Sequence, residues 1–150
     1  MNTLFAYGSL MCADIMQQVC GQILPGEHAV LPDYQRLRVL GEEYPAIIHC
    51  TGSQVEGRLY RGLCAAAWQR LDAFEGEMYQ RLEVRLLTAG RHELSQAYVI
   101  HPRYRDQLDD QAWDFAHFLR HGKARFQQRY CGFQDLAAAS SEQSPEQAPD

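Results

Sequence analysis

The sequence predicts an α+β fold, a small mixed β-barrel with flanking helices. Short apolar segments typical of strands fill most of the first hundred residues, and few helical segments separate them. This arrangement favours a sheet that curls toward a barrel over a doubly wound parallel sheet. The chain has 150 residues, 46% of them hydrophobic, which suits one domain with its own core. We expect residues 1–136 to form this domain and residues 137–150, rich in Ala, Ser, Glu, Gln and Pro, to be a flexible polar tail.

The first forty residues are predicted to contain one strand, one short helix and an extended segment. Residues 4–7 are an apolar and aromatic run that ends at Gly8, typical of a buried strand. Residues 11–19 place apolar side chains at helical spacing. Residues 21–40 contain two prolines and indicate extended chain.

The middle of the chain is predicted to form four strands and the clearest helix. The strands are expected at residues 45–49, 54–60, 81–87 and 95–100. Thr51-Gly52-Ser53 predicts a hairpin turn between the first two, and residues 89–92 predict a turn between the last two. Between these pairs, residues 64–75 contain three successive alanines and end at Gly76, which is typical of a helix.

Another predicted helix begins at Asp109, a suitable N-cap, and runs to about His121. Its apolar stripe would consist of Ala112, Phe115, Ala116 and Leu119. Gly122 is expected to end this helix, and a second short helix is expected to follow as far as Tyr130.

Charge and cysteine content exclude several classes of protein. The net charge is −5, which argues against a nucleic-acid-binding protein with its usual basic surface. No apolar stretch approaches the ~20 residues of a membrane span, and no signal peptide is evident, so we expect a soluble cytoplasmic protein. Five cysteines without a C-x-x-C pair argue against a disulfide framework. We expect them to be small buried thiols, with a catalytic cysteine as the alternative.

Metal and nucleotide sites are not expected either. His117 and His121 lie one helical turn apart, but they face away from the predicted apolar stripe and lack a third ligand. The sequence contains no G-x-S-x-G elbow, phosphate loop or dinucleotide fingerprint.

The first candidate site is Tyr7-Gly8-Ser9-Leu10, at a junction between strand and helix. Backbone N–H groups at such a junction form a concavity that binds a carboxylate or a developing oxyanion. The glycine allows the sharp turn and a close approach of ligand. A plain turn without a ligand is the other interpretation of this segment.

The second candidate is Glu75. In the predicted helix it continues the stripe formed by Cys64, Trp68 and Leu71, where the pattern calls for an apolar side chain. Apolar surroundings and the helix C-terminus should both raise its pKa, which suits a group that exchanges protons near neutral pH. A structural ion pair with Arg81 is the alternative, and Glu77 is a rival that we expect to be solvated.

The third candidate is Tyr79-Gln80-Arg81, at the start of the following strand. Tyr79 is placed to offer a hydroxyl to a ligand or to Glu75, and Arg81 is able to bind a carboxylate. Core packing of the tyrosine is the alternative.

Three segments in this order resemble the gamma-glutamylcyclotransferase-like family. They are Phe5-Ala6-Tyr7-Gly8-Ser9-Leu10, Val55-Glu56-Gly57-Arg58-Leu59-Tyr60, and Leu71-Asp72-Ala73-Phe74-Glu75-Gly76 followed by Tyr79-Gln80-Arg81. The resemblance covers roughly residues 4–100. Many relatives have glycine before the aromatic residue at the position of Tyr34, where this chain has Pro32-Asp33-Tyr34.

The resemblance implies a small mixed barrel with a cavity at its mouth and a gamma-glutamyl small molecule as substrate. The loop Tyr7 to Leu10 would bind the glutamyl group, Tyr79 would line the pocket and Glu75 would be the acid/base. The α-amine of the glutamyl group would attack its own γ-carbonyl and release 5-oxoproline and a free amine or amino acid, without metal or organic cofactor. The alternatives are a non-catalytic module that binds a small carboxylate, and a gamma-glutamyl transferase or hydrolase. The leaving amine and the oligomeric state stay open.

Overall fold

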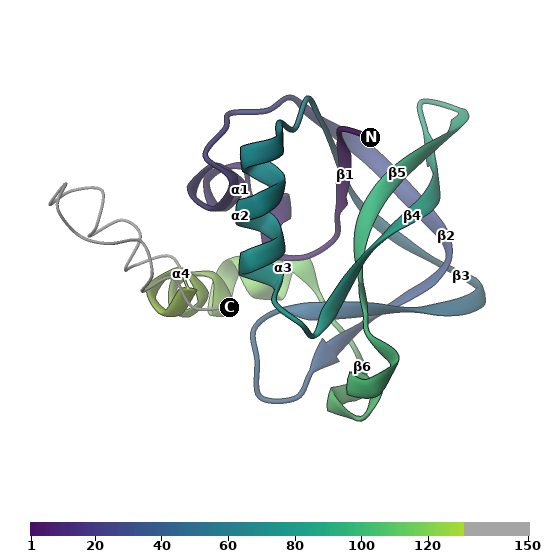
Figure 1. Ribbon diagram of the computed structural model, residues 1–150. Coiled ribbons are helices and arrows are strands. Elements are labelled where there is room, and N and C mark those ends of the chain that lie inside the picture. The colour runs from purple at the N-terminus through teal and green to yellow at the C-terminus, as the bar shows by residue number, and fades with distance from the viewer. Residues whose placement is uncertain (131–150) are drawn as a thin grey trace, which may run out of the picture.

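Five strands close into a barrel in the computed structural model, which describes residues 1–130 (Figure 1). The strands of the sheet are β1 (Thr3–Ala6), β2 (Gly26–Val39), β3 (Pro45–Arg61), β4 (Tyr79–Thr88), β5 (Arg91–Ile100) and β6 (Leu108–Ala112). Their order is β3-β1-β5-β4-β2-β6, and the pairing of β2 with β3 completes the ring and leaves β6 outside it. Because β1 and β5 are parallel and the other pairs antiparallel, the barrel is mixed, as the sequence predicts.

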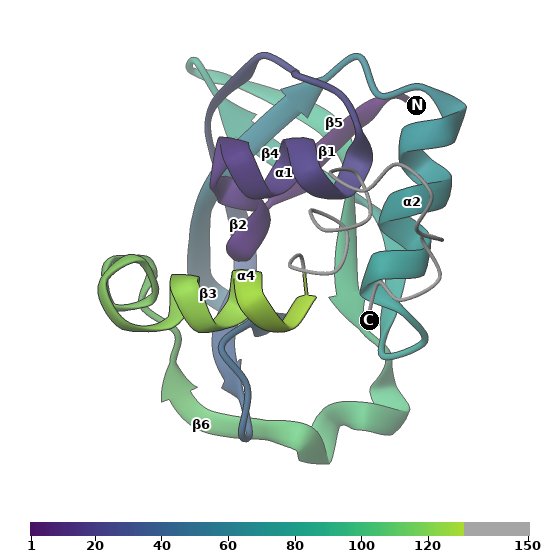
Figure 2. The same cartoon turned by 90° about the vertical axis from the view of Figure 1, so that its left-hand side faces the viewer.

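Helices cover one side of this barrel. A 3-10 turn (Ser9–Met11) leads from β1 into α1 (Ala13–Cys20), and α2 (Ala65–Glu75) packs beside α1 (Figure 2). Near the C-terminal end of the described chain, α3 (Phe115–His117) continues through a π-helical turn (Phe118–Gly122) into α4 (Lys123–Tyr130). No helix of residues 1–130 is long and apolar enough to cross a membrane.

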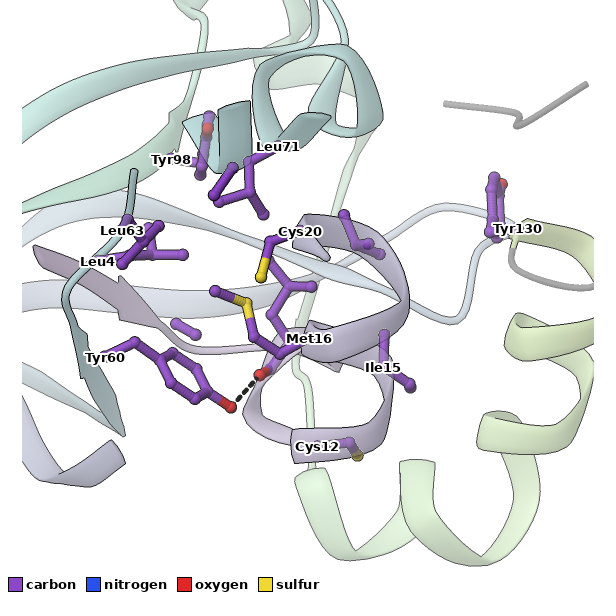
Figure 3. Close-up of a cluster of buried hydrophobic side chains, with 14 of the residues drawn as sticks. Leu4, Cys12, Ile15, Met16, Cys20, Tyr60, Leu63, Leu71, Tyr98 and Tyr130 are labelled. Carbon is purple, nitrogen blue, oxygen red and sulfur yellow. Dashed lines mark hydrogen bonds between the residues drawn. The ribbon is translucent and has the colours of Figure 1, made fainter. Parts of the chain in front are cut away.

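Strand β1 is buried on both faces, which explains its continuous apolar sequence. Phe5 points into the barrel and packs with Leu31 and Ile47. Leu4 faces the other way, into a cluster shared with the helices that includes Ile15 and Leu71 (Figure 3). These alternating side chains tie the barrel interior to the helical layer, so the end of β1 is held between two cores.

The predicted hairpin at residues 51–53 is wrong, because β3 runs without interruption and pairs with β2 along its length. The register passes from Pro32 opposite Gln54 to Tyr34 opposite His49, so four residues of β3 face Asp33 alone. Asp33 has a φ of 65°, and its Oδ1 accepts a hydrogen bond of 3.0 Å from the N–H of Gly52, whose φ is 89°. Gly52 therefore marks a bulge that bends a long strand rather than a turn that ends one.

The predicted helix from Asp109 to His121 is also wrong in its limits. Asp109 lies in β6, which pairs with β2, and the helix begins after Asp114, whose Oδ1 accepts a hydrogen bond of 3.0 Å from the N–H of Ala116. Gly122 does not end the helix, which continues through the π turn into α4. The buried side chains are consequently Phe118 and Phe126, whereas Leu119 is 45% exposed.

The predicted turn between β4 and β5 is confirmed, whereas the prediction of buried cysteines holds for only part of the described set. The turn at residues 89–92 has positive φ at Ala89 and Gly90, as a tight hairpin requires. Cys12 and Cys20 are buried thiols, but Cys64 is exposed and Cys50 is half-buried. The predicted tail, residues 137–150, and Cys131 lie outside the described residues.

Candidate active site

A cavity of about 480 Å³ opens between the end of β1, the end of α2 and α4. Six of the residues that the sequence singled out as candidates for binding or catalysis line it, namely Tyr7, Gly8, Ser9, Leu10, Glu75 and Tyr79, whereas Arg81 does not. The cavity thus joins segments that are about seventy residues apart in the sequence.

Glu75 is the last residue of α2, and Gly76, with a φ of 72°, carries the chain out of the helix. The helix buries Trp68 and Leu71 on the same stripe, so the carboxyl group of Glu75 is directed inward, where it is partly exposed to the cavity. Burial raises the pKa of this carboxyl to about 8, and the nearby charge of Asp72 adds to the effect. Among residues 1–130, no cation or hydrogen-bond donor compensates for it.

The alternative ion pair between Glu75 and Arg81 does not form. The guanidinium of Arg81 instead lies 3.5 Å from Oδ2 of Asp72 and 4.4 Å from the ring centre of Trp68, outside the cavity lining. Arg81 is therefore a structural residue and not the carboxylate ligand that its position suggested. Glu77 is exposed, as expected, and accepts a hydrogen bond of 2.8 Å from the hydroxyl of Tyr104.

The loop from Tyr7 to Leu10 is held from two sides. The hydroxyl of Tyr7 donates to the backbone carbonyl of Tyr98, and Nη1 of Arg36 donates to the carbonyl of Tyr7 at 2.8 Å. Within residues 1–130, the backbone N–H groups of Gly8, Ser9 and Leu10 donate to no protein acceptor. Because buried N–H groups are seldom left unpaired, these donors are available to a ligand in the cavity.

Gly8 is required by a close approach rather than by its φ of −130°. A Cβ at this position would lie 2.8 Å from Cδ of Pro45, which is closer than real Cβ contacts. The carbonyl of Pro45 in turn accepts a hydrogen bond of 2.8 Å from the hydroxyl of Tyr79. Pro45 therefore contacts the loop at Gly8 and the wall residue Tyr79 at the same time, so a shift of one would disturb the other.

Tyr79 lines the cavity, and burial together with Tyr7 and Glu75 raises its pKa well above the ordinary value. The phenol is consequently neutral, and its hydroxyl donates a hydrogen bond to the backbone carbonyl of Pro45. Its oxygen remains able to accept a hydrogen bond from an ammonium group or from protonated Glu75.

Sequence reasoning missed the residues that complete the wall. Most of these residues are aromatic. The aromatic ones are Tyr44, Phe74, Tyr98, Tyr104, Phe126 and Tyr130. They come from five separate segments of the chain, so no local sequence pattern predicts that they line one cavity. Arg36, which holds the loop from behind the cavity, was also missed, since an arginine in an extended segment is ordinarily a surface residue.

Metal ligands do not gather anywhere in residues 1–130, where no group of three suitable side chains occurs. His117 and His121 have ring centres 4.8 Å apart on the exposed side of their helix. The cavity therefore offers a proton acceptor of unusual pKa and a set of unpaired backbone donors, but no metal-binding cluster of its own.

Comparison with known proteins agrees with this geometry. A sequence profile of the family described as "Gamma-glutamyl cyclotransferase, AIG2-like" matches residues 4–115. AIG2-like protein D of Arabidopsis thaliana is 36% identical over 87 residues, which are 58% of this chain and 57% of that protein. The chain thus aligns with little more than half the length of this relative.

Two solved structures show the same fold. A solution structure of another Arabidopsis thaliana protein has a TM-score of 0.67 at 21% identity and covers 99% of this chain and 90% of that one. The crystal structure of an AIG2-like protein from Mus musculus has a TM-score of 0.57 at 20% identity, with coverage of 76% and 88%. With the profile match across most of its length, the chain belongs to the AIG2-like gamma-glutamyl cyclotransferase family.

Proposed function

We propose that this protein is a gamma-glutamyl cyclotransferase that converts a gamma-glutamyl amide into 5-oxoproline and a free amine. The observation that carries the proposal is the isolated carboxyl of Glu75, with a pKa of about 8, in one cavity with the unpaired N–H groups after β1. The family description names the same reaction type. Because the nucleophile belongs to the substrate, the enzyme needs no nucleophilic serine or cysteine.

Glu75 would transfer the proton that the reaction requires. The α-amine of the substrate binds as an ammonium and gives a proton to the Glu75 carboxylate, and its nitrogen then attacks the γ-carbonyl carbon. A new C–N bond closes the five-membered ring, and the original amide C–N bond breaks as Glu75 returns the proton to the leaving nitrogen. The ring nitrogen then loses its second surplus proton through the freed Glu75 carboxylate to the released amine, which departs as an ammonium. A carboxyl whose pKa lies near the working pH performs both transfers, which is worth roughly 10²–10⁴-fold in rate.

The loop from Gly8 to Leu10 would hold the glutamyl group by its oxygens. Three backbone N–H groups without protein acceptors suit the α-carboxylate or the γ-carbonyl oxygen as that oxygen becomes negative. Enclosure of the flexible glutamyl chain in a cavity of about 480 Å³ would also favour the cyclising conformation.

The direct test is Glu75→Gln, assayed for 5-oxoproline release from a panel of gamma-glutamyl compounds. The amide has the size of the protonated acid but cannot exchange the proton, so kcat should fall by roughly 10²–10⁴-fold while the fold persists. Glu83→Gln is the matched control, because Glu83 is exposed on β4 and does not line the cavity. Full activity of Glu75→Gln would show that the mechanism is wrong.

A non-catalytic module that binds a small carboxylate is the second candidate, since the unpaired N–H groups alone support it. A gamma-glutamyl compound that binds to the wild-type protein without any release of 5-oxoproline would favour this candidate.

A further inference from the structure

Arg36 contacts the binding loop from outside the cavity. It lies in β2 and does not line the cavity, but lines a separate cleft of about 280 Å³ together with Trp113. Its Nη1 donates to the backbone carbonyl of Tyr7 at 2.8 Å and to that of Glu56 at 3.1 Å. The guanidinium therefore joins the residue that follows β1 to strand β3.

Packing, and not an acid, fixes the position of this guanidinium. Its carbon lies 5.2 Å from the ring centre of Trp113, whose indole N–H is itself hydrogen-bonded to the backbone. Within residues 1–130, Arg36 forms no ion pair with a carboxylate. The two acids that act on it through space have other partners, since Glu56 pairs with His28 and Asp114 caps α3. The contacts of the positive charge are consequently backbone carbonyls.

The carbonyl of Tyr7 and the N–H of Gly8 belong to one peptide group. Because this group is planar and trans, the N–H points away from the carbonyl, and whatever holds the oxygen also fixes the direction of the N–H. A hydrogen bond from a cation to the oxygen polarises the group, so the N–H becomes a stronger donor. Gly8 lines the cavity, and among the described residues its N–H has no acceptor. Arg36 thus acts on the first donor of the loop without touching a ligand.

We propose that Arg36 is a positioning residue that orients and polarises the N–H of Gly8 toward the γ-carbonyl oxygen of the substrate. This inference rests on the proposed function and extends it to the group that stabilises the oxyanion. The γ-carbonyl oxygen becomes negative as the α-amine forms the new C–N bond, and it becomes a carbonyl again as the original amide C–N bond breaks. A polarised donor therefore binds the transition state more tightly than the ground state, while Arg36 keeps its proton throughout.

Arg36→Met tests the inference, because it keeps an apolar stem beside Trp113 and removes the charge and the donors. The assay is 5-oxoproline release from the gamma-glutamyl compound of the panel that the wild-type protein uses best. We expect kcat to fall at least roughly tenfold and KM to change less than about threefold. Arg36→Lys retains a charged donor and should recover part of the lost kcat. Arg38→Met is the matched control, since Arg38 is exposed on the same strand and contacts Gln111, and it should keep the wild-type kcat.

Two further measurements separate this role from a merely structural one. The assays are run where circular dichroism shows each variant fully folded, so a lower stability alone leaves kcat unchanged. The amide ¹⁵N resonance of Gly8 reports on the hydrogen bond at the carbonyl of Tyr7, because both atoms belong to one peptide group. It should shift in Arg36→Met and stay in place in Arg38→Met. If Arg36→Met does not fold, Arg36→Gln, which keeps only a neutral donor, should still lose kcat several-fold.

The outcomes distinguish this inference from the proposed function. Wild-type kcat in the Arg36 variant that folds, or an unchanged Gly8 resonance, would overturn the inference and leave the reaction intact. A rise in KM at unchanged kcat would also overturn it, because the loop would then hold a group whose charge stays constant. If the wild-type protein releases no 5-oxoproline from any compound, the proposed function fails and the inference fails with it.

Discussion

Glu75 combines a cost to folding with the catalytic role that we propose for it. Its helix buries Trp68 and Leu71, and this stripe directs the carboxyl away from bulk water without a cation to stabilise it. A charged carboxyl in such surroundings is disfavoured, and protonation relieves the penalty. The same position therefore gives a proton acceptor suited to neutral pH and a site of local instability.

The stability of the protein should depend on pH through Glu75. The carboxyl ionises near pH 4.5 when unfolded and near pH 8 when folded, so between these values the folded state holds the additional proton. The contribution of Glu75 to the free energy of unfolding should then fall as pH rises from 4.5 to 8, by at most about 1.4 kcal/mol per pH unit. Above pH 8 it should level off.

Glu75→Gln should remove this dependence, because the amide has no proton to lose. We expect the variant and the wild-type protein to have similar stability near pH 4.5, and the variant to be more stable at pH 8 by an amount on the order of a few kcal/mol. Urea unfolding of both proteins at pH 5, 6.5 and 8 measures the difference. A difference that does not vary with pH would contradict the assigned pKa.

The catalytic rate should respond to pH in the opposite direction. Only the ionised carboxyl accepts the proton of the substrate ammonium, so kcat/KM of the wild-type protein should rise with pH and begin to level off near pH 8. Each unit below that value should lower kcat/KM about tenfold. A profile of 5-oxoproline release from pH 6 to 9 tests this, and a limb near pH 4.5 would show that burial does not govern the acid.

At the level of single helices and strands, the sequence pattern predicts local structure but not which strands pair with one another. The helix ending at Glu75 and the strand ending before Gly8 were predictable because each is defined by its own periodicity and a terminal glycine. Gly52 and Asp109 gave wrong predictions because pairing with β2 decides both, and that pairing joins residues distant in sequence. The aromatic wall escaped prediction for the same reason, since α4 brings Phe126 and Tyr130 to the cavity from the end of the described chain.

The loop between β1 and α1 should be sensitive to the smallest added side chain. In Gly8→Ala, the new Cβ would approach Cδ of Pro45 to 2.8 Å, so the loop must move away from the wall that Tyr79 supports. Overpacking of this kind costs about 1–3 kcal/mol, and movement of the N–H groups should lower kcat/KM by at least roughly tenfold. Thermal unfolding and 5-oxoproline release measure both effects. Gly41→Ala, where a Cβ meets nothing within 4 Å but φ is 76°, controls for the loss of glycine flexibility and should retain activity.

The cavity exists only when three distant parts of the molecule meet. The closed barrel fixes the end of β1, packing of α2 on α1 places Glu75, and α4 adds its aromatic rings against Tyr44. Phe126 and Tyr130 belong to the core cluster between barrel and helices, so α4 is part of the core as well as of the site. Stability and activity of the whole molecule should consequently depend on the chain as far as α4.

Two truncations separate the contribution of α4 from that of the predicted tail. Removal of residues 137–150, whose composition provides few apolar side chains for burial, should leave Tm and kcat/KM unchanged. A chain that ends at Gly122 lacks Phe126 and Tyr130, and loss of a large buried aromatic side chain typically costs about 3–5 kcal/mol. This shorter chain should have a Tm lower by at least roughly 10 °C and no measurable 5-oxoproline release. If the first truncation lowers Tm as much as the second, residues 137–150 belong to the folded domain and its boundary at residue 136 is wrong.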